Sequence, residues 1–417
     1  PLSKARKEIE LAFSRPWDQL FVELGPPVAA ASIAQVHKAE VAANGERRAV
    51  AVKVLRPGIE KQFERDLESF YFAARSAELF LPKMRRLRPV AAVDTLAQTV
   101  LLEMDLRLEA AAISEMAENI AAAGDVGFHV PKVDWERTAR RVLTLEWIDA
   151  IPLTDIEAVR AAGVDLQALG LNVIRSFLRH AIRDGFFHAD MHQGNLFVDP
   201  RDGALIAVDF GIMGRIGPAE RRFLAEILYG FITRNYRRIA EVHFEAGYVP
   251  SSKDVAAFAQ ALRSIGEPIM GRPAGDISMA RLLTQLFEVT ELFSMKMRPE
   301  LLLLQKTMVV VEGVARSLDP SLNIWMAAEP VVRDWIAAQL GPAVQIRDAM
   351  RELAEIAEAL RQAPRLVERG ARLVDALEDR ARTVEGVPLR ELRQRLWIAV
   401  PLWIAAVTLL AIAVKLL

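Results

Sequence analysis

The stretch that decides the fold is His188-Ala189-Asp190-Met191-His192-Gln193-Gly194-Asn195, followed a short distance later by Val208-Asp209-Phe210-Gly211. Asp190, Asn195 and Asp209 supply hard oxygen atoms, the ligands that Mg²⁺ prefers in proteins. Between them lie the apolar stretches 196–198 and 205–208, which read as two short strands joined by a turn. Asp and Asn are also common in solvated turns, but the order, the spacing and the flanking strands together favour a metal-assisted site.

This order of residues is typical of the catalytic half of a kinase-type phosphoryl-transfer site. In such sites the loop Asn and the Asp of Asp-Phe-Gly hold magnesium, while the loop Asp orients the attacking hydroxyl. We therefore predict that Asn195 and Asp209 bind Mg²⁺ and that Asp190 acts on the nucleophile. His192 lies in the same loop, but it is the weaker candidate for a base because Asp190 already holds that position.

The other half of such a site is expected upstream. Val50-Ala51-Val52-Lys53 reads as a strand whose lysine would contact the α- and β-phosphates. The cover over the phosphates would be Ala29-Ala30-Ala31-Ser32-Ile33-Ala34-Gln35-Val36, with alanines where kinases have glycines. Alanine disfavours positive φ and close backbone approach. We therefore expect a stiffer cover, with a helical turn that offers its N–H groups to the anion as one option.

Lys53 needs a carboxylate partner, and residues 102–110 offer three. If this stretch is one helix, Asp105 and Glu109 share a face, while Glu103 lies about 120° from Glu109 around the axis. We favour Glu109 as the partner, with Glu103 as the second choice. Adenine would bind backbone groups of a hinge formed by Glu146-Trp147-Ile148-Asp149, a placement that rests on order along the chain.

The composition excludes several other classes of protein. Lys and Arg (53) nearly balance Asp and Glu (54), so no basic face for nucleic acid is expected. Cysteine is absent, which rules out disulfides and thiolate metal sites and suits a reducing compartment. No secretory signal is visible, and because the sequence begins at Pro1 we expect its true start to lie upstream.

One hydrophobic run has the length of a membrane span. Residues 396–417 contain a single charge, Lys415, and as a helix would extend roughly 33 Å, close to the ~30 Å hydrocarbon core. Arg390, Arg393 and Arg395 precede the run. By the positive-inside tendency they place the main domain on the cytoplasmic face of the inner membrane. A buried soluble helix is the alternative, but such helices rarely run this long without a polar face.

Together these features predict an α+β, bilobed, protein-kinase-like fold. The 417 residues allow two or three domains. We expect a helical segment and link in 1–27, closed by Gly25-Pro26-Pro27, a small β-containing N-lobe in 28–150, a mostly helical C-lobe in 151–340, a charged helical spacer in 341–395 and a transmembrane helix in 396–417. The N-lobe should contain strands at 33–41, 49–55, 130–133 and 141–148, with helices over 57–123 broken near Pro82 and Pro89. Almost everything after Gly211 reads as helix.

With these motifs in place, the sequence resembles the UbiB/AarF family of atypical protein-kinase-like proteins, which are associated with ubiquinone biosynthesis. The shared motifs are the alanine-rich 29–37, Lys53 with Arg56-Pro57-Gly58, Glu103-x-Asp105 with Glu109, the loop 188–195, Asp209-Phe210-Gly211 and the stretch Glu312-Gly313-Val314-Ala315-Arg316-Ser317-Leu318-Asp319-Pro320. The resemblance extends over about residues 20–330.

The resemblance implies binding of ATP or ADP with Mg²⁺, and an atypical kinase or ATPase activity that supports quinone assembly at the membrane. Membrane lipids, quinone precursors, other proteins of quinone biosynthesis and a second copy of the chain are the candidate partners. The family's Lys-x-Gly-Gln tetrapeptide is absent from this sequence, which we attribute to truncation. Only one hydrophobic C-terminal helix is visible, whereas members commonly have two.

Two departures from ordinary protein kinases change the expected substrate. Ala189 replaces the Arg that senses a phosphorylated activation loop. After Gly211 no Ala-Pro-Glu precedes the next predicted helix, so a peptide-docking platform is missing. Arg215 could meet a phosphate, although a solvated loop residue is the simpler interpretation. Three hypotheses remain: a UbiB-type ATP-dependent enzyme, which we favour, a nucleotide-gated module for lipids or quinone precursors with slow ATPase activity, and a small-molecule phosphotransferase.

Overall fold

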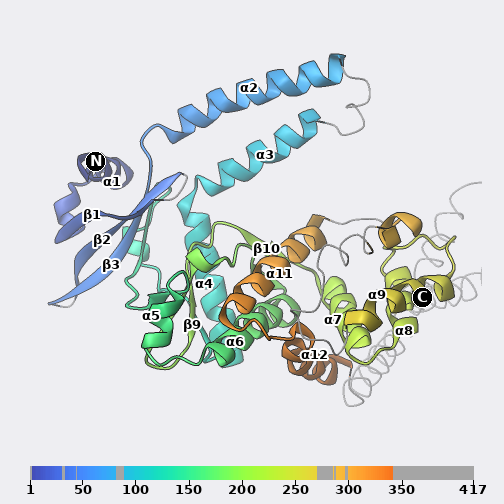
Figure 1. Cartoon of the computed structure of the whole chain (residues 1–417). Coiled ribbons are helices and arrows are strands. Elements are labelled where there is room, and N and C mark those ends of the chain that lie inside the picture. Colours follow the sequence, from blue (N-terminus) through green and yellow to red (C-terminus); the bar gives the residue numbers. More distant parts are fainter. Residues whose placement is uncertain are drawn as a thin grey trace, which may run out of the picture. The chain divides into compact units, whose positions relative to one another are not determined.

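The computed structural model of the chain describes residues 2–30, 33–43, 45–80, 89–269, 285, 288–295 and 299–340. Almost all of them belong to one compact unit that ends at Ile336. In this unit an antiparallel sheet near the N-terminus is followed by a mainly helical region (Figure 1).

The N-lobe is built on a sheet in the order β1–β2–β3–β5. Its strands are β1 (Glu23–Ala30), β2 (Ala34–Ala43), β3 (Glu46–Leu55) and β5 (Val142–Glu146), and all neighbours are antiparallel. Val50, Val52 and Val54 of β3 are buried and pack in one cluster with Ile9 of α1 (Leu2–Phe13). Because side chains alternate between the faces of a strand, this spacing buries one face of β3. Gly45, with φ of +84°, lies just before β3 in a backbone conformation that favours glycine.

Strand β1 corrects one expectation from the sequence. Gly25-Pro26-Pro27 does not close an irregular link but lies inside β1. The strand is at the edge of the sheet, and its register with β2 shifts on both sides of Pro27. Proline cannot donate to a β-ladder, so an irregular edge strand is the place where a sheet tolerates it.

The alanine-rich cover is extended where it is described, and the option of a helical turn is therefore wrong for those residues. Ala29 and Ala30 end β1 and lie opposite Val36 and Gln35 of β2. The described part of the cover thus belongs mainly to the paired ends of two antiparallel strands. Ala31 and Ser32, which belong to the predicted nucleotide contacts, lie outside the described residues.

The helices of the N-lobe are α2 (Ile59–Phe80), α3 (Pro89–Glu103) and α4 (Leu106–Ala123). Helix α3 begins at Pro89, and the predicted break near Pro82 lies outside the described residues. A second break, between Glu103 and Leu106, corrects the treatment of 102–110 as one helix. The Asp105 side chain accepts a hydrogen bond from the Arg107 N–H (3.2 Å) and so caps a new helix. Glu103 and Glu109 therefore lie on different helices, and their angular relation around one axis does not apply.

The C-lobe is mainly helical in its described part. Its helices are α5 (Ile156–Ala161), α6 (Leu166–Leu178), α7 (Pro218–Ile232), α8 (Tyr236–Glu245), α9 (Val255–Ile269), α11 (Pro299–Leu318) and α12 (Ile324–Leu340). After α6 a π-helical turn at Arg179–Asp184 leads through Gly185 (φ +69°) into β7 (Phe186–His188). The C-lobe helix α6 thus delivers the chain to residues 188–195, which we call the catalytic loop.

Short strands frame this loop. One sheet has the order β4 (Phe128–His129), β9 (Leu205–Ala207), β8 (Leu196–Val198) and β6 (Ile151–Pro152), and a second pairs β7 with β10 (Met213–Arg215). Strands β8 and β9 lie where the sequence predicts them. The strand predicted at 130–133 is wrong, because β4 precedes it and pairs with β9, while Val133 forms only an isolated bridge to Leu145. Strand β10 was not predicted either.

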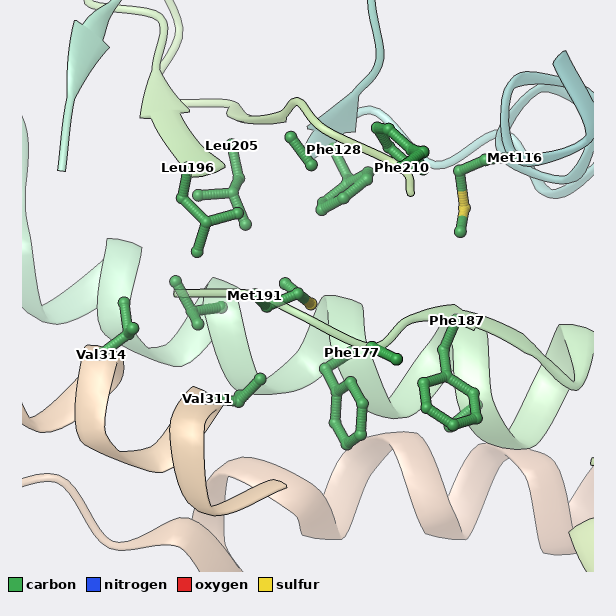
Figure 2. Close-up of a cluster of buried hydrophobic side chains, with 14 of the residues drawn as sticks. Met116, Phe128, Phe177, Phe187, Met191, Leu196, Leu205, Phe210, Val311 and Val314 are labelled. Carbon is green, nitrogen blue, oxygen red and sulfur yellow. The ribbon is translucent and has the colours of Figure 1, made fainter. Parts of the chain in front are cut away.

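A buried cluster supports the catalytic loop from within the C-lobe (Figure 2). Met191 of the loop lies between Leu196 on β8 and Phe177 on α6. Val311 and Val314 place α11 in the same cluster. The loop is therefore fixed by packing from a helix that precedes it, a hairpin that follows it and a helix more than a hundred residues further on in the sequence.

No helix among the described residues combines the length and the apolar character needed to cross a membrane. The predicted spacer, 341–395, and the predicted transmembrane helix, 396–417, lie outside that part of the chain.

Candidate active site

The candidate active site centres on Lys53. Strand β3 places this residue between Val36 of β2 and Leu143 of β5. Its Nζ donates to both carboxylate oxygens of Glu109 and to Oδ1 of Asp209, each at 2.9 Å. Glu109 comes from α4 and Asp209 follows β9. One ammonium group therefore joins three elements that are far apart in the sequence, and Glu109, the favoured partner, is in contact with it.

The three groups shift one another's pKa values. Burial lowers the pKa of Lys53, but the carboxylates of Glu109 and Asp209 outweigh burial and hold this pKa above its usual value. Burial raises the pKa of Asp209, and the Lys53 ammonium outweighs it and leaves that pKa below its usual value. The Glu109 side chain is 5% exposed, and burial raises its pKa. Lys53 is consequently a cation at neutral pH, the state that binds phosphate.

Asp209 occupies an unusual backbone conformation. Its φ is +61°, in the left-handed region that a non-glycine residue adopts at some cost. The Val208 N–H donates to the Asn195 carbonyl at 2.9 Å, next to the pairing of Leu196 with Ala207. The β8–β9 hairpin therefore brings Asn195 and Asp209 to the same end, which is where the predicted metal ligands have to meet.

His188 ties the catalytic loop to the segment before Asp209. Its Nδ1 accepts the Asp190 N–H at 3.1 Å, so the proton lies on Nε2, which donates to the Val208 carbonyl at 3.1 Å. Burial lowers the pKa of His188, which keeps the ring neutral and preserves this pattern. The ring also contacts Phe210, at 4.8 Å between centroids. The first His of the motif thus positions Asp190 relative to the Asp-Phe-Gly segment.

Helix α11 holds the catalytic loop through Thr307 and Ser317, which were not predicted as site residues from the sequence. The buried Thr307 Oγ1 lies 3.0 Å from the Ala189 carbonyl, and Gln193 Nε2 donates to Ser317 Oγ at 2.6 Å. Thr307 also lies 2.8 Å from the Leu303 carbonyl, the usual partner of a helical threonine. The sequence signal for Thr307 is weak. It consists only of a polar residue at helical spacing from apolar ones.

The donor set fits magnesium bound together with a nucleotide. Asn195 Nδ2 donates to the Asp190 carbonyl at 3.1 Å, which leaves the amide oxygen Oδ1 for a cation. Asp209 uses Oδ1 for Lys53, and its carboxylate also accepts a hydrogen bond from the Gly211 N–H. The two oxygens of a carboxylate have about four acceptor sites in all, which leaves room for a cation. In the described part of the chain, no three His, Asp or Glu side chains are grouped so that they could hold a metal. Mg²⁺ does not need such a group, because phosphates and water commonly complete its shell around one or two protein ligands.

Glu103, the second choice as partner of Lys53, lies at the end of α3, and the charges of Lys53 and Asp209 act on it as well. Burial raises its pKa, and the Asp209 carboxylate adds to the rise while Lys53 opposes it. The ion pairs of Lys53 are with Glu109 and Asp209. Glu103 therefore contributes negative potential beside Asp190 and Asp209, which would attract a divalent cation.

The predicted hinge begins at Glu146, the last residue of β5, and two of its amides already donate hydrogen bonds within the protein. The Glu146 N–H donates to the Lys132 carbonyl (2.8 Å) and the Trp147 N–H to the Ala49 carbonyl (3.3 Å). The Trp147 indole is held by Asp149 Oδ1 at 3.0 Å. Contacts from this segment to adenine would have to come from its other backbone groups, including those of Ile148.

The segment after Gly211 leaves little room for a peptide platform. Strand β10 pairs with β7 at once, and α7 begins at Pro218. Arg215 forms an ion pair with Glu115 and lies over the ring of Phe186, at 4.3 Å from the centroid. The structure therefore shows Arg215 engaged with Glu115 and Phe186 rather than available for a phosphate.

Comparisons with known proteins agree with this geometry. Residues 1–243 match the ABC1 atypical kinase-like domain, and residues 262–323 match the UbiB helical domain. A protein of Marinobacter nauticus named "Probable protein kinase UbiB" is 40% identical over 371 residues, which is 88% of this chain and 67% of the relative. Proteins of the same name from Aeromonas hydrophila (39%, covering 84% and 64%) and Xanthomonas axonopodis (40%, covering 87% and 66%) are also similar. The chain thus spans about two thirds of the length of these relatives.

A solved structure supports the fold. The complex of Rv3197 with erythromycin from Mycobacterium tuberculosis superposes with a TM-score of 0.59 and 25% identity, over 79% of this chain and 83% of that one. The predicted α+β kinase-like fold, with a β-containing N-lobe and a helical C-lobe, is confirmed.

Proposed function

The chain belongs to the UbiB family of ABC1 atypical kinase-like proteins, and we propose that it transfers or hydrolyses the γ-phosphoryl group of ATP in support of ubiquinone biosynthesis. The observation that carries this proposal is the contact of Lys53 with both Glu109 and Asp209 at 2.9 Å. It unites a phosphate-binding cation with a metal-binding carboxylate, next to a hairpin that also presents Asn195. A nucleotide with its divalent cation requires this pair of charges.

In the proposed site each residue has a distinct task. Lys53 binds the α- and β-phosphates under the cover formed by 29–36, and Asn195 and Asp209 hold Mg²⁺. The metal, when bound, neutralises charge that develops on the phosphate oxygens. Asp190 accepts a hydrogen bond from the attacking hydroxyl or water. Because an ammonium has three N–H donors and all three point to carboxylates here, a phosphate oxygen must replace at least one of them.

The acceptor we propose is a small molecule or water rather than a folded protein. This follows from the short path between Gly211 and α7, which β10 fills. We further propose that residues 396–417 anchor the protein in the cytoplasmic membrane with the kinase-like domain on the cytoplasmic side. The support is the sequence alone, namely an apolar run preceded by Arg390, Arg393 and Arg395.

Asp209→Asn tests the metal assignment, with Asp18→Asn as the matched control because Asp18 is exposed on the short turn Trp17–Gln19 and is not one of the proposed site residues. Calorimetric titration with ATP or ADP, with and without Mg²⁺, is the measurement. We expect magnesium to strengthen binding to the native protein and to Asp18→Asn, and to have little effect on Asp209→Asn. Unchanged magnesium dependence in Asp209→Asn would show that this carboxylate is not a ligand.

Asp190→Asn separates turnover from binding. We expect it to bind magnesium nucleotide as the native protein does and to lose phosphate release by a factor of about 10²–10⁴, the usual contribution of a positioned base. Cells that carry Asp190→Asn should lose ubiquinone and accumulate a precursor. A normal quinone profile would remove the pathway from the proposal.

A lipid-responsive module with slow ATPase activity is the second candidate. The observation that favours it is the full engagement of Lys53 by carboxylates, which would make nucleotide turnover depend on a rearrangement. Phosphate release measured with anionic vesicles, and separately with a phenolic quinone precursor, discriminates the two functions. Phosphate transfer to the phenol supports the enzyme, whereas hydrolysis stimulated by vesicles alone supports the module. Deletion of 396–417 should abolish membrane association in either case.

A further inference from the structure

The catalytic loop holds a second histidine, His192, whose ring is fixed by the loop itself. Its Nδ1 accepts the Gly194 N–H at 3.0 Å, at the start of the short 3₁₀ turn Gln193–Asn195. A ring nitrogen that accepts a hydrogen bond carries no proton, so a neutral His192 bears its hydrogen on Nε2. The main chain of His192 is fixed as well, because its carbonyl accepts the Asn195 N–H at 2.9 Å.

The protonated nitrogen faces the predicted base. Nε2 lies 3.6 Å from Oδ2 of Asp190. This distance is longer than a hydrogen bond, but hydrogen bonds of catalytic groups are often long without substrate and shorten in the reacting complex. The side chains of His192 and Asp190 are 50% and 33% exposed, so both remain accessible to a ligand.

Gly194 lies tight against this ring. A Cβ on Gly194 would lie 2.9 Å from Cε1 and 3.1 Å from Nδ1 of His192. Real Cβ atoms essentially never come as close as the first of these contacts. Gly194 is not among the glycines with positive φ, so conformational freedom does not explain it. The loop is therefore shaped to seat the imidazole in this one orientation.

We propose that His192 is a positioning residue for Asp190. Its Nε2–H holds Oδ2 of the carboxylate, which leaves Oδ1 for the attacking hydroxyl or water. The nearby carboxylate of Glu103 has the opposite effect, since it repels Asp190. A hydrogen bond from His192 would restrain Asp190 without competing for magnesium. This inference rests on the phosphoryl-transfer function proposed above.

Two substitutions separate the two ring nitrogens. In His192→Asn the amide oxygen can still accept the Gly194 N–H, as in an Asx turn, but no donor reaches Asp190. In His192→Gln the longer amide can still donate to Asp190, but the acceptor for Gly194 is lost. The measurements on the full chain are kcat and KM for ATP in phosphate release, together with the melting temperature.

We expect His192→Asn to keep its KM and melting temperature and to lose kcat by a factor on the order of 100, the effect of a misplaced reacting group. His192→Gln should retain most of the native kcat although its melting temperature falls. The reverse pattern, with native kcat in His192→Asn and low kcat in His192→Gln, would show that the ring only caps the turn and would overturn the proposal.

Gly194→Ala gives an independent perturbation, because its Cβ displaces the ring without removing it. We expect it to lower kcat as His192→Asn does. The double variant should be no worse than His192→Asn alone, since asparagine lacks the Cε1 atom of the closest contact. Additive losses would contradict the shared cause.

A final measurement does not depend on turnover. The protein has six histidines, and the spectrum of His192→Asn identifies the His192 signals among them. Long-range ¹⁵N–¹H NMR of the native protein should show the Nε2–H tautomer, and the Nδ1–H tautomer would overturn the inference. If the native protein releases no phosphate, the proposed function fails, while this measurement still decides the orientation of the ring.

Discussion

His180 should make the protein sensitive to acid. The residue lies in the π-helical turn before β7, is fully buried, and packs its ring against the edge of Phe128 at 4.6 Å between centroids. Neither ring nitrogen has a hydrogen-bond partner in the described structure. Burial therefore lowers the pKa of His180 from 6.5 to about 3, and the neighbouring Arg183 and Arg179 add to the effect while Asp125 opposes it.

The sign and size of the effect follow from linkage. The folded state binds the proton less readily than the unfolded state, so stability is complete above pH 6.5 and falls as the pH drops towards 3. With these two pKa values, the loss at pH 5 is about 2 kcal/mol relative to pH 8, at ~1.4 kcal/mol per unit of pKa. His180→Phe keeps the aromatic contact and removes the titration.

Urea unfolding of both proteins at pH 8 and pH 5, followed by circular dichroism, measures this difference. Any constant penalty for the larger phenylalanine ring cancels, because only the change between the two pH values is compared. The buried His188 and His243 also have lowered pKa values, and their contributions cancel in the same comparison. If the native protein and His180→Phe lose equal stability between pH 8 and pH 5, the ring is solvated or paired, and the reasoning is refuted.

Two further predictions concern the contacts that hold the catalytic loop and the strand before it. Thr307→Val should lose about 1–3 kcal/mol of stability and lower kcat, because the buried Ala189 carbonyl loses its side-chain donor. Thr307→Ser should stay close to the native protein in stability and in kcat. Equal kcat in the two variants would contradict a role of Thr307 in positioning the loop. Gly214→Ala should destabilise by about 1–3 kcal/mol, because its Cβ would lie 2.1 Å from the ring of the buried Phe187. Gly313→Ala in α11 is its control, since no described atom outside its own stretch of helix lies within 4 Å of the added methyl group, and helix propensity predicts a gain of up to about 1 kcal/mol. A melting curve of Gly214→Ala that matched the control would show that the β7–β10 contact is not tight.

Short-range patterns predicted the parts of the site that lie on one element. Strands β8 and β9 lie where the apolar stretches on either side of the turn put them, and β3 carries Lys53 as its alternation suggests. Such patterns work because the period of side-chain burial is a local property. The same local reasoning failed at Asp105, where side-chain capping competes with helix continuation, and at Gly25-Pro26-Pro27, where the edge of a sheet accepts prolines.

Contacts between distant segments were predictable only as a short set of choices. Three carboxylates between 102 and 110 could have met Lys53, and only the break after Glu103 together with the packing of α4 selects Glu109. The hydrogen bond between Thr307 and the Ala189 carbonyl joins residues 118 positions apart, and no pattern in the sequence predicts this pairing.

The sequence by itself determined which chemical groups this protein can bring together, since the identity and order of Lys53, Asp190, Asn195 and Asp209 predict a site for a nucleotide with a hard cation. The tertiary structure alone decided which carboxylate pairs with Lys53 and which helix holds the catalytic loop. The physical reason is that side-chain chemistry is fixed by covalent structure. The distances that turn it into a site depend on the packing of elements whose contacts the chain order does not specify.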